Sequence, residues 1–231
     1  IEYAEKKSFS IYVKFSYVNG ADSTLPAGFD TSKLFSVIWT TTPWTMPANQ
    51  AISVNPELDY SWVKIGDEAW LLANGLIETA TKEMGVESYE VLNTFKGSEL
   101  ELANFKHPFA DRNAPILLGS HVTLDAGTGC VHTAPAHGED DFNVVKAYKD
   151  AGKIDFDILS LVDATGRYIA KVDEPRYGDT EQPLAGVEIH DAEVPVIKIL
   201  AHNGALVQKG NIRHQYAHCW RCKNPVIYRA T

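Results

Sequence analysis

The alternation of hydrophobic and polar residues predicts a chain built mainly of β-strands. Residues 9–18 are rich in aromatic and β-branched side chains that alternate at a period of two, and Asn19-Gly20 then provides a turn. Gly66-Asp67, between two further alternating runs, indicates a tight hairpin. The further predicted strands are residues 34–39, 60–65, 69–73, 89–95, 114–118 and 129–133.

Three other stretches have helical patterns, at residues 74–84, 137–152 and 192–208. Asn74 is expected to cap the first helix and Gly85 to stop it. The second begins with three acidic residues that complement the helix dipole, and Asn203-Gly204 weakens the third at its middle. Many short strands with three isolated helices indicate an α+β fold with a β-barrel-like core and a few peripheral helices.

The chain has 231 residues and a net charge of −9, which argues against non-specific nucleic-acid binding by the chain as a whole. The charge is uneven, because residues 139–193 carry 14 acidic and 6 basic groups while residues 194–231 carry 6 basic groups and no acidic one. These stretches could be solvated faces or could be related to a ligand. No apolar run approaches the roughly 20 residues that cross a bilayer, so no membrane partner is expected. Ile1, without an initiator Met, suggests a cut from a longer chain.

The three cysteines, an odd number, favour a reducing compartment over a disulfide framework. Cys219 and Cys222 form a C-x-x-C pair, which is half of a zinc-ribbon ligand set. The sequence holds no second pair, and His214 and His218 are the residues that could complete a site. Free thiols and a zinc site divided by truncation are the alternatives.

The segment WTTTPWTMPAN, residues 39–49, is the first of two that could carry chemistry. Pro43 and Pro47 disfavour helical geometry in the residue before each, so a strand is expected to break into a rigid, kinked loop. Such a loop could form a small polar pocket with aromatic walls, or be an edge strand with its threonines on the wet face. The hydroxyls displayed are those of Thr40, Thr41, Thr42 and Thr45.

The second segment is DAGTGCVHTAPAHGEDDF, residues 125–142. Gly127 and Gly129 permit close backbone approach, and a short strand is expected to present His132. Asp141, at the start of the second predicted helix, could hold an amine-bearing substrate while His132 shapes or polarises the site. The alternative is a capping cluster with one satisfied core histidine.

Two other enzyme chemistries are possible from the same residues. His132 and His137 with Asp140 or Asp141 could ligate a metal, although their spacing across a proline turn is not that of helical zinc hydrolases. Cys130 and His132 could form a nucleophile pair, although neighbours at i and i+2 lie about 6.5 Å apart along a strand. No G-x-S-x-G sequence is present.

Together, WTTTPWTMPAN and GTGCVHTAPAHGEDDF resemble the editing domain of bacterial-type isoleucyl-tRNA synthetase, an insertion in the catalytic domain of that class I enzyme. HCWRCKNPVIYRAT resembles the family's return strand to the catalytic core, whereas valyl and leucyl relatives usually have TTRP in the threonine region. The resemblance implies a single editing domain over residues 1–231, with residues 1–18 and 212–231 as arms to the core. Because HIGH and KMSKS signatures are absent, we do not expect a complete synthetase.

The resemblance implies post-transfer editing, in which mischarged valyl-tRNA(Ile) is hydrolysed and valine released. One methylene supplies only about 1–3 kcal/mol of discrimination, a limit for which the isoleucyl enzyme is itself the standard example. A second pocket, which admits valine and excludes isoleucine, supplies the remaining discrimination between the two amino acids. A metal-dependent hydrolase of small acyl substrates and a catalytically silent module that binds the tRNA 3′ end are the alternatives.

The same resemblance gives the site residues their expected roles. Asp141 holds the substrate α-ammonium, while Thr42 and His132 exclude the larger side chain. Cys130 stands where relatives commonly have Ala and is interpreted as a small buried residue. Thr40 and Thr41 are expected to position the ester and the terminal adenosine, and Trp39 and Asn49 to line the pocket. The expected catalytic residues are Thr40, Thr42, His132 and Asp141. The expected substrate-binding residues are Trp39, Thr41, Thr45, Asn49, Gly129 and His137.

The expected mechanism uses a positioned water, with oriented hydroxyls and amides to stabilise developing charge and no metal or covalent intermediate. No cofactor is expected in this chain, although full-length relatives use ATP and Mg, and Cys219 and Cys222 would be half of a zinc site. The expected partners are the tRNA(Ile) 3′ end carrying valine and the rest of the synthetase, in a cytoplasmic monomer. The negative charge then argues only against tight, independent RNA binding.

Overall fold

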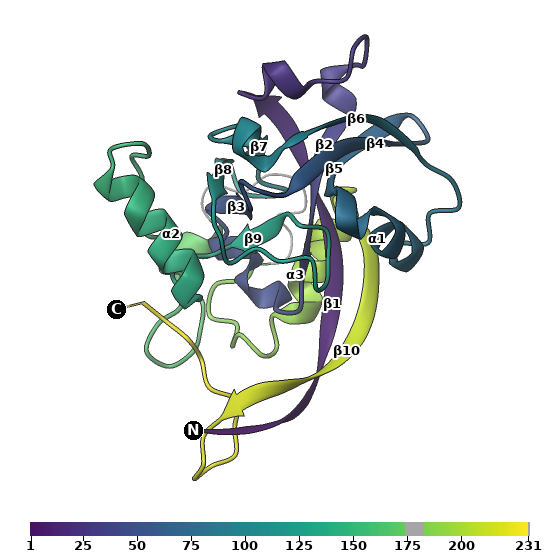
Figure 1. The fold of residues 1–231 in the computed structure, drawn as a ribbon. Helices are drawn as coiled ribbons and strands as arrows, with labels where there is room; N and C mark the ends of the chain where they lie inside the picture. Colours follow the sequence, from purple (N-terminus) through teal and green to yellow (C-terminus); the bar gives the residue numbers. More distant parts are fainter. Residues whose placement is uncertain (174–182, 231) are drawn as a thin grey trace.

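Six strands form a closed barrel at the centre of the molecule, in a computed structural model that describes residues 1–173 and 183–230 (Figure 1). The last strand of the series pairs again with the first, which closes the sheet. In spatial order they are β1 (Glu2–Asn19), β7 (Asn104–Lys106), β8 (Asn113–Leu118), β3 (Ala51–Val54), β9 (Val131–Thr133) and β2 (Leu34–Thr40). The β8–β3 and β9–β2 pairs are parallel and the others antiparallel.

Four more strands extend the sheet on two sides of the barrel. The long β10 (Leu206–His218) runs antiparallel to β1, so Glu2 pairs with His218 and the two ends of the chain lie on the same side of the molecule (Figure 1). On the other side β2 continues into β5 (Glu68–Ala73), β4 (Asp59–Ile65) and β6 (Glu90–Lys96). The β4–β5 hairpin turns at Gly66, as predicted, with a positive φ of 62°.

Helices lie around the sheet and in the connections. The α-helices of the described residues are α1 (Ile77–Glu83), α2 (Glu139–Asp150) and α3 (Glu193–His202). Short 3₁₀ helices are η1 (Asp22–Thr24), η2 (Thr31–Lys33), η3 (Pro43–Ala48), η4 (Asn74–Leu76), η5 (Gly97–Leu100) and η6 (Ala170–Asp173). Within the described residues, none of the helices combines the length and apolarity that crossing a membrane requires.

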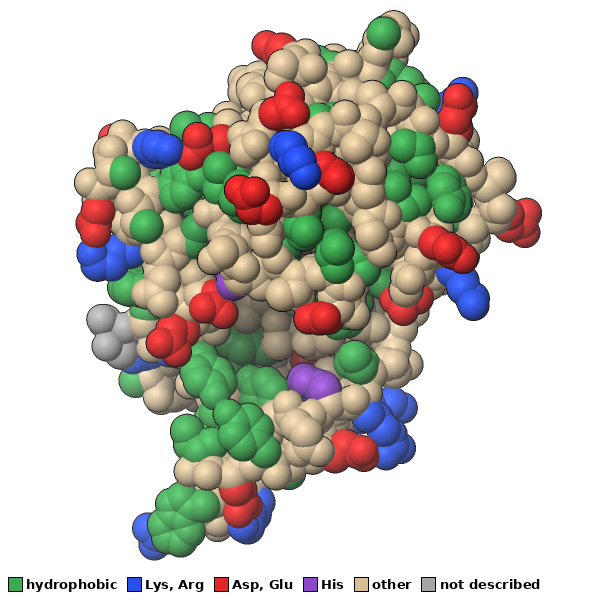
Figure 2. Space-filling model, in the orientation of Figure 1, with side chains coloured by type: hydrophobic (Ala, Val, Ile, Leu, Met, Phe, Trp, Pro, Cys, Tyr) green, Lys and Arg blue, Asp and Glu red, His purple; other side chains and the backbone are tan. Residues whose placement is uncertain are grey.

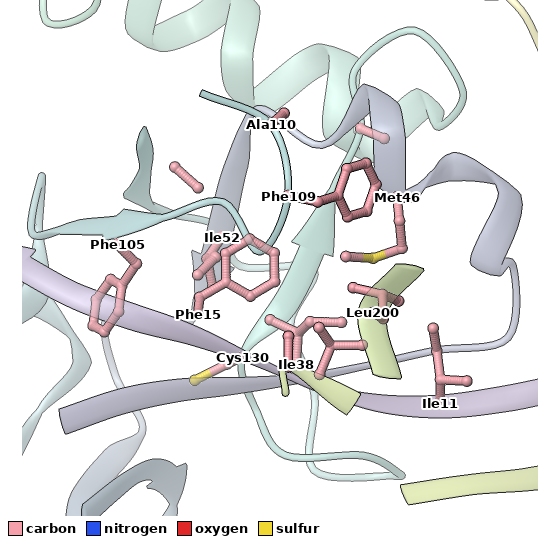
Figure 3. Close-up of a cluster of buried hydrophobic side chains, with 14 of the residues drawn as sticks. Ile11, Phe15, Ile38, Met46, Ile52, Phe105, Phe109, Ala110, Cys130 and Leu200 are labelled. Atoms are coloured by element: carbon pink, nitrogen blue, oxygen red, sulfur yellow. The ribbon is translucent and has the colours of Figure 1, made fainter. Parts of the chain in front are cut away.

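The core fills the barrel with side chains that follow the strand period of two. Ile11, Val13 and Phe15 of β1 are fully buried in the main core, whereas Tyr12 packs outside it with Trp70. The interior side chains come from several strands, from η3 and from α3; Figure 3 labels Ile11, Phe15, Ile38, Met46, Ile52, Phe105, Phe109, Ala110, Cys130 and Leu200. The predicted α+β, barrel-like fold is therefore confirmed.

Three predictions of local structure are wrong. Asn74 does not cap α1, because its side-chain oxygen accepts a hydrogen bond from Ser61 at 2.7 Å, and the helix starts at Ile77. The third helix ends at His202, because Gly204 turns the chain at φ 69° and residues 206–218 pair with β1 instead. The segment from Pro43 is a 3₁₀ helix, η3, rather than the kinked loop that was predicted, and the short strands β3 and β7 were not predicted.

Candidate active site

Both chemistry-bearing segments border one cavity of about 370 Å³. The lining residues come from the end of β2, from η3, from β9, from the start of α2 and from the loop between β8 and β9. Figure 2 shows that this face of the molecule is hollowed, with acidic side chains around the hollow. The lining residues are Trp39, Thr40, Thr41, Thr42, Thr45, His121, Val122, Thr123, Asp125, Ala126, Val131, His132, Ala134, His137 and Asp141.

The threonines form a chain of hydrogen bonds at the end of β2. The backbone N–H of Thr42 donates to the Thr40 hydroxyl at 3.1 Å, and the Thr45 hydroxyl donates to the Thr42 carbonyl at 2.8 Å. The Oγ1 of Thr42 lies 3.2 Å from that of Thr40 and 3.3 Å from that of Thr45. Because β2 pairs with β1, β5 and β9, the edge-strand interpretation of this segment is wrong.

Buried side chains from distant parts of the chain hold η3 in place. His107 donates from Nε2 to the Met46 carbonyl at 2.9 Å, and Arg112 donates from Nε to the Asn49 carbonyl at 2.8 Å. Tyr168 donates its hydroxyl to the carbonyl of Trp44. The helix thus has partners for its buried carbonyls although two prolines interrupt its own hydrogen bonding, and its hydroxyls are fixed in space.

His132 is buried in the cavity wall, and both of its ring nitrogens have partners. Nδ1 lies 2.8 Å from the amide nitrogen of Asn49, and Nε2 lies 2.9 Å from the Thr45 hydroxyl. Because the Asn49 amide and the Thr45 hydroxyl have their own carbonyl acceptors, in Ala51 and Thr42, Nδ1 accepts and Nε2–H donates.

Burial, with the nearby charges of His137 and Arg112, lowers the pKa of His132 to about 3. The ring is consequently neutral at physiological pH, with its N–H committed to Thr45. It can shape the cavity and order the threonines, but it has no free nitrogen with which to accept a proton from a substrate.

Asp141 is one of two carboxylates that line the cavity among the described residues, and it lies in the first turn of α2. Its Oδ2 accepts the backbone N–H of Ala134 at 2.8 Å, and a Cβ at Gly138 would come 2.8 Å from the same oxygen. Burial raises the pKa of Asp141, while the Ala134 hydrogen bond opposes that rise. A half-buried carboxylate whose Oδ1 has no hydrogen-bond partner among the described residues is suited to binding a cation.

The other expected substrate-binding residues are divided between the cavity and the structure behind it. Trp39, Thr41, Thr45 and His137 line the cavity. Asn49 and Gly129 do not line it: Asn49 lies fully buried behind His132. Gly129 has a positive φ of 78°, and a Cβ there would come 2.3 Å from that of Ala73, so this position supports the wall through close backbone packing.

His137 is tied to the C-terminal segment. Its Nδ1–H donates to the carbonyl of Tyr228 at 2.9 Å, and its ring lies edge-on to Trp44, with centroids 4.9 Å apart. The backbone N–H of Ala230 donates to the Ala136 carbonyl at 2.8 Å beside it. Residues 228–230 thus hold the connection that carries both His137 and the start of α2.

The structure also bears on the thiol and metal alternatives. Cys130 is buried, its thiol lies 3.6 Å from the Leu71 carbonyl, and burial raises its pKa to about 12, so it is a small buried residue rather than a nucleophile. In residues 1–173 and 183–230, no three His, Cys, Asp or Glu side chains are grouped as metal ligands.

Sequence reasoning began the second segment at Asp125 and did not find residues 119–124, which bring His121 and Thr123 to the cavity. The Thr123 hydroxyl donates to the Asp125 carboxylate at 2.8 Å. The loop has no hydrophobic period, and its position directly before the GTG sequence is the signal that could have revealed it.

The barrel and cavity define an editing domain of the class I aminoacyl-tRNA synthetase type. A family model described as leucyl-tRNA synthetase, editing domain, matches residues 30–168, and the chain belongs to that family. Curated relatives named isoleucine–tRNA ligase, from Kosmotoga olearia and Brevibacillus brevis, are 46% and 49% identical over the whole of this chain. The resemblance found in the two motifs is therefore confirmed. The chain spans 22% and 23% of the length of those two relatives.

Solved structures of editing domains share the fold. The crystal structure of GlLeuRS-CP1 matches with a TM-score of 0.66 at 17% identity, covering 90% of this chain and 99% of that one. The Plasmodium falciparum cytosolic leucyl-tRNA synthetase editing domain matches with a TM-score of 0.62 at 11% identity, covering 91% of this chain and 100% of that one.

Proposed function

We propose that this chain hydrolyses the ester of valyl-tRNA(Ile), releasing valine from the mischarged tRNA. The observation that carries the proposal is the pairing, in one cavity, of the half-buried Asp141 carboxylate with the fixed hydroxyls of Thr40 and Thr42. An aminoacyl ester carries an α-ammonium group and a polar ester within a few atoms of each other. The cavity offers an anion for the first and hydroxyls for the second.

Discrimination against isoleucine rests on two cavity-lining side chains, those of Thr42 and His132, which are held in fixed positions. Thr42 is hydrogen-bonded to Thr40, and His132 is held at both ring nitrogens, so neither side chain can move aside without losing buried hydrogen bonds. An added methylene must then displace packed, hydrogen-bonded groups, which costs more than one methylene gains by burial.

The chemistry is attack of water on the ester carbonyl, with the ribose oxygen as the leaving group. The Thr40 oxygen accepts the Thr42 N–H, and its own O–H, 3.2 Å from the Thr42 hydroxyl, can turn to donate to the developing oxyanion. Cys130 offers no nucleophile, and the two nitrogens of His132 are occupied. The acceleration of ester hydrolysis by these residues thus comes from the positioning of water and substrate.

The remaining assignments follow from the same function. The 3′ end of tRNA(Ile) enters the cavity, while the rest of a cytoplasmic, monomeric synthetase grips the body of the tRNA. This arrangement accommodates the net charge of −9, because only the aminoacylated end of the RNA meets this acidic domain.

Substitution of neighbouring carboxylates tests the proposal. In Asp141→Asn the α-ammonium loses its counter-charge, and KM for valyl-tRNA(Ile) should rise about 10- to 100-fold, the equivalent of a charge-assisted hydrogen bond of about 1.5–3 kcal/mol. Asp140 is exposed in the same turn of α2, so Asp140→Asn is the matched control and should leave KM unchanged. Equal kinetics of the Asp141 variant and wild type would refute the assignment.

A further inference from the structure

His121 is a cavity residue to which the proposed function gives no role. It lies in the loop between β8 and β9 and lines the same cavity as the threonines of β2 and η3. The ring rests against the backbone of Gly119, where a Cβ would come 2.4 Å from Cε1 and 2.7 Å from Nδ1. A glycine at position 119 is therefore what leaves space for the ring in this place.

The nitrogens of His121 differ from those of the other two histidines at the cavity. Both nitrogens of His132 are hydrogen-bonded, and Nδ1 of His137 donates to the Tyr228 carbonyl, while Nε2 of His137 is buried without a partner among the described residues. The ring of His121 has no hydrogen bond among the described residues, and its Nε2 is buried without a partner. A buried ring nitrogen without a partner is costly, which indicates that a ligand or water completes the hydrogen bonding when the cavity is occupied.

Two carboxylates, Asp125 and Asp141, line the same cavity as His121. Asp141 is near enough for the charge of His121 to influence its carboxyl, and Asp125 lies on the rim with Thr123 as its partner. Asp140 also acts on Asp141 from the exposed side of α2. Among the described residues, the titratable groups that line this cavity with His121 are Asp125, His132, His137 and Asp141.

We propose that His121 is a further catalytic residue, the base that binds the attacking water and accepts its proton. The proposal rests on the proposed hydrolase function. As the water oxygen forms its bond to the ester carbonyl carbon, one proton passes from the water to a nitrogen of the His121 ring. When the bond between the carbonyl carbon and the ribose oxygen breaks, that proton passes to the ribose oxygen, which leaves as a hydroxyl. Asp141 stays free to hold the ammonium.

The test is the variant His121→Gln, which can still hydrogen-bond to water but cannot take its proton. With valyl-tRNA(Ile) as substrate, kcat should fall about 100-fold or more while KM stays within twofold, and the acid limb of the kcat–pH profile should disappear. The exposed His202 at the end of α3 gives the control, His202→Gln, which should match wild type.

A second variant guards against a folding defect. Gly119→Ala retains the histidine but drives a methyl group into its ring, so kcat should fall at least tenfold. Both variants should bind 3′-deoxy-3′-(L-valylamino)adenosine, a non-hydrolysable mimic of the substrate end, as wild type does.

The outcomes separate this proposal from the proposed function. If His121→Gln retains kcat within threefold of wild type, or keeps the acid limb unchanged while kcat falls, His121 is not the base although the hydrolase function stands. If the wild-type chain does not hydrolyse valyl-tRNA(Ile) at all, both proposals are overturned.

Discussion

The amide nitrogen of Asn49 lies 2.8 Å from Nδ1 of His132, and this contact decides which ring nitrogen carries the proton. The Ala51 carbonyl accepts from the same amide nitrogen at 2.9 Å, which fixes the orientation of the amide. His132 must accept at Nδ1 and donate from Nε2 to Thr45, so Asn49 sets the direction of the hydrogen bonds leading to the threonines.

Asn49→Asp should reverse that direction. A carboxylate at this position accepts a proton from Nδ1, so Nε2 becomes an acceptor and the Thr45 hydroxyl must choose between it and the Thr42 carbonyl. We expect a 10- to 100-fold loss of kcat for valyl-tRNA(Ile), on the scale at which partners of catalytic groups act. The nitrogen NMR shifts of His132 should report the change of tautomer. Asn113→Asp, an exposed position on β8, is the control, and an unchanged tautomer in the Asn49 variant would contradict this role.

The stability of the domain should fall with acid partly because of His132. Its pKa is lowered to about 3 in the folded protein, whereas an unfolded histidine titrates at about 6.5. Between these values the unfolded chain binds the extra proton, so stability rises with pH and is lost as pH falls below about 6.5. His132→Gln should reduce the slope of unfolding free energy against pH by about 1.4 kcal/mol per unit in this window. Denaturant titrations at several pH values measure it, and an unchanged slope would show that the ring is protonated when folded.

Gly129 should tolerate a side chain less well than Gly152. Both have a positive φ, 78° and 68°, but a Cβ at Gly152 meets nothing within 4 Å while one at Gly129 meets Ala73 at 2.3 Å. Gly152→Ala should cost about 1–2 kcal/mol from backbone strain alone. Gly129→Ala should cost about 1–3 kcal/mol more, because the core is overpacked. Urea unfolding of the two variants compares them, and equal losses would show that the Gly129 contact relaxes freely.

This chain should bind no stoichiometric zinc. Cys219 and Cys222 are two ligands, and the histidines that could complete a site have other partners: His214 is hydrogen-bonded to Ser8, and His218 donates to the Tyr216 carbonyl. Metal analysis of the purified chain should give much less than one equivalent, and a chelator should leave deacylation unchanged. One equivalent of zinc that Cys219→Ser removes would contradict this prediction.

The alternation of hydrophobic and polar side chains was enough to predict the longer strands and the barrel-like fold. A strand that is buried on one face shows this alternation within its own few residues of sequence. The third predicted helix shows the limit of that signal. Residues 206–208 join β10 because β1 offers them a long unpaired edge, and that edge is formed by residues about 200 positions away.

The candidate site was predicted to a similar degree. Motifs placed Thr40, Thr42 and Asp141 at one cavity, since each motif is continuous in sequence. His121 was missed because the fold alone brings its loop to the cavity, and Asn49 was assigned to the lining although it lies behind His132. The spacing of residues along the chain indicates neither the position of His121 at the cavity nor the contact between Asn49 and His132.

The most direct measurement is the rate at which the purified chain deacylates valyl-tRNA(Ile) compared with isoleucyl-tRNA(Ile). The fixed wall of Thr42 and His132 should refuse the larger side chain, so we predict rapid release of valine and, for isoleucine, a rate near that of the uncatalysed ester. Equal rates for the two substrates, or no acceleration of valine release over the uncatalysed rate, would contradict the account.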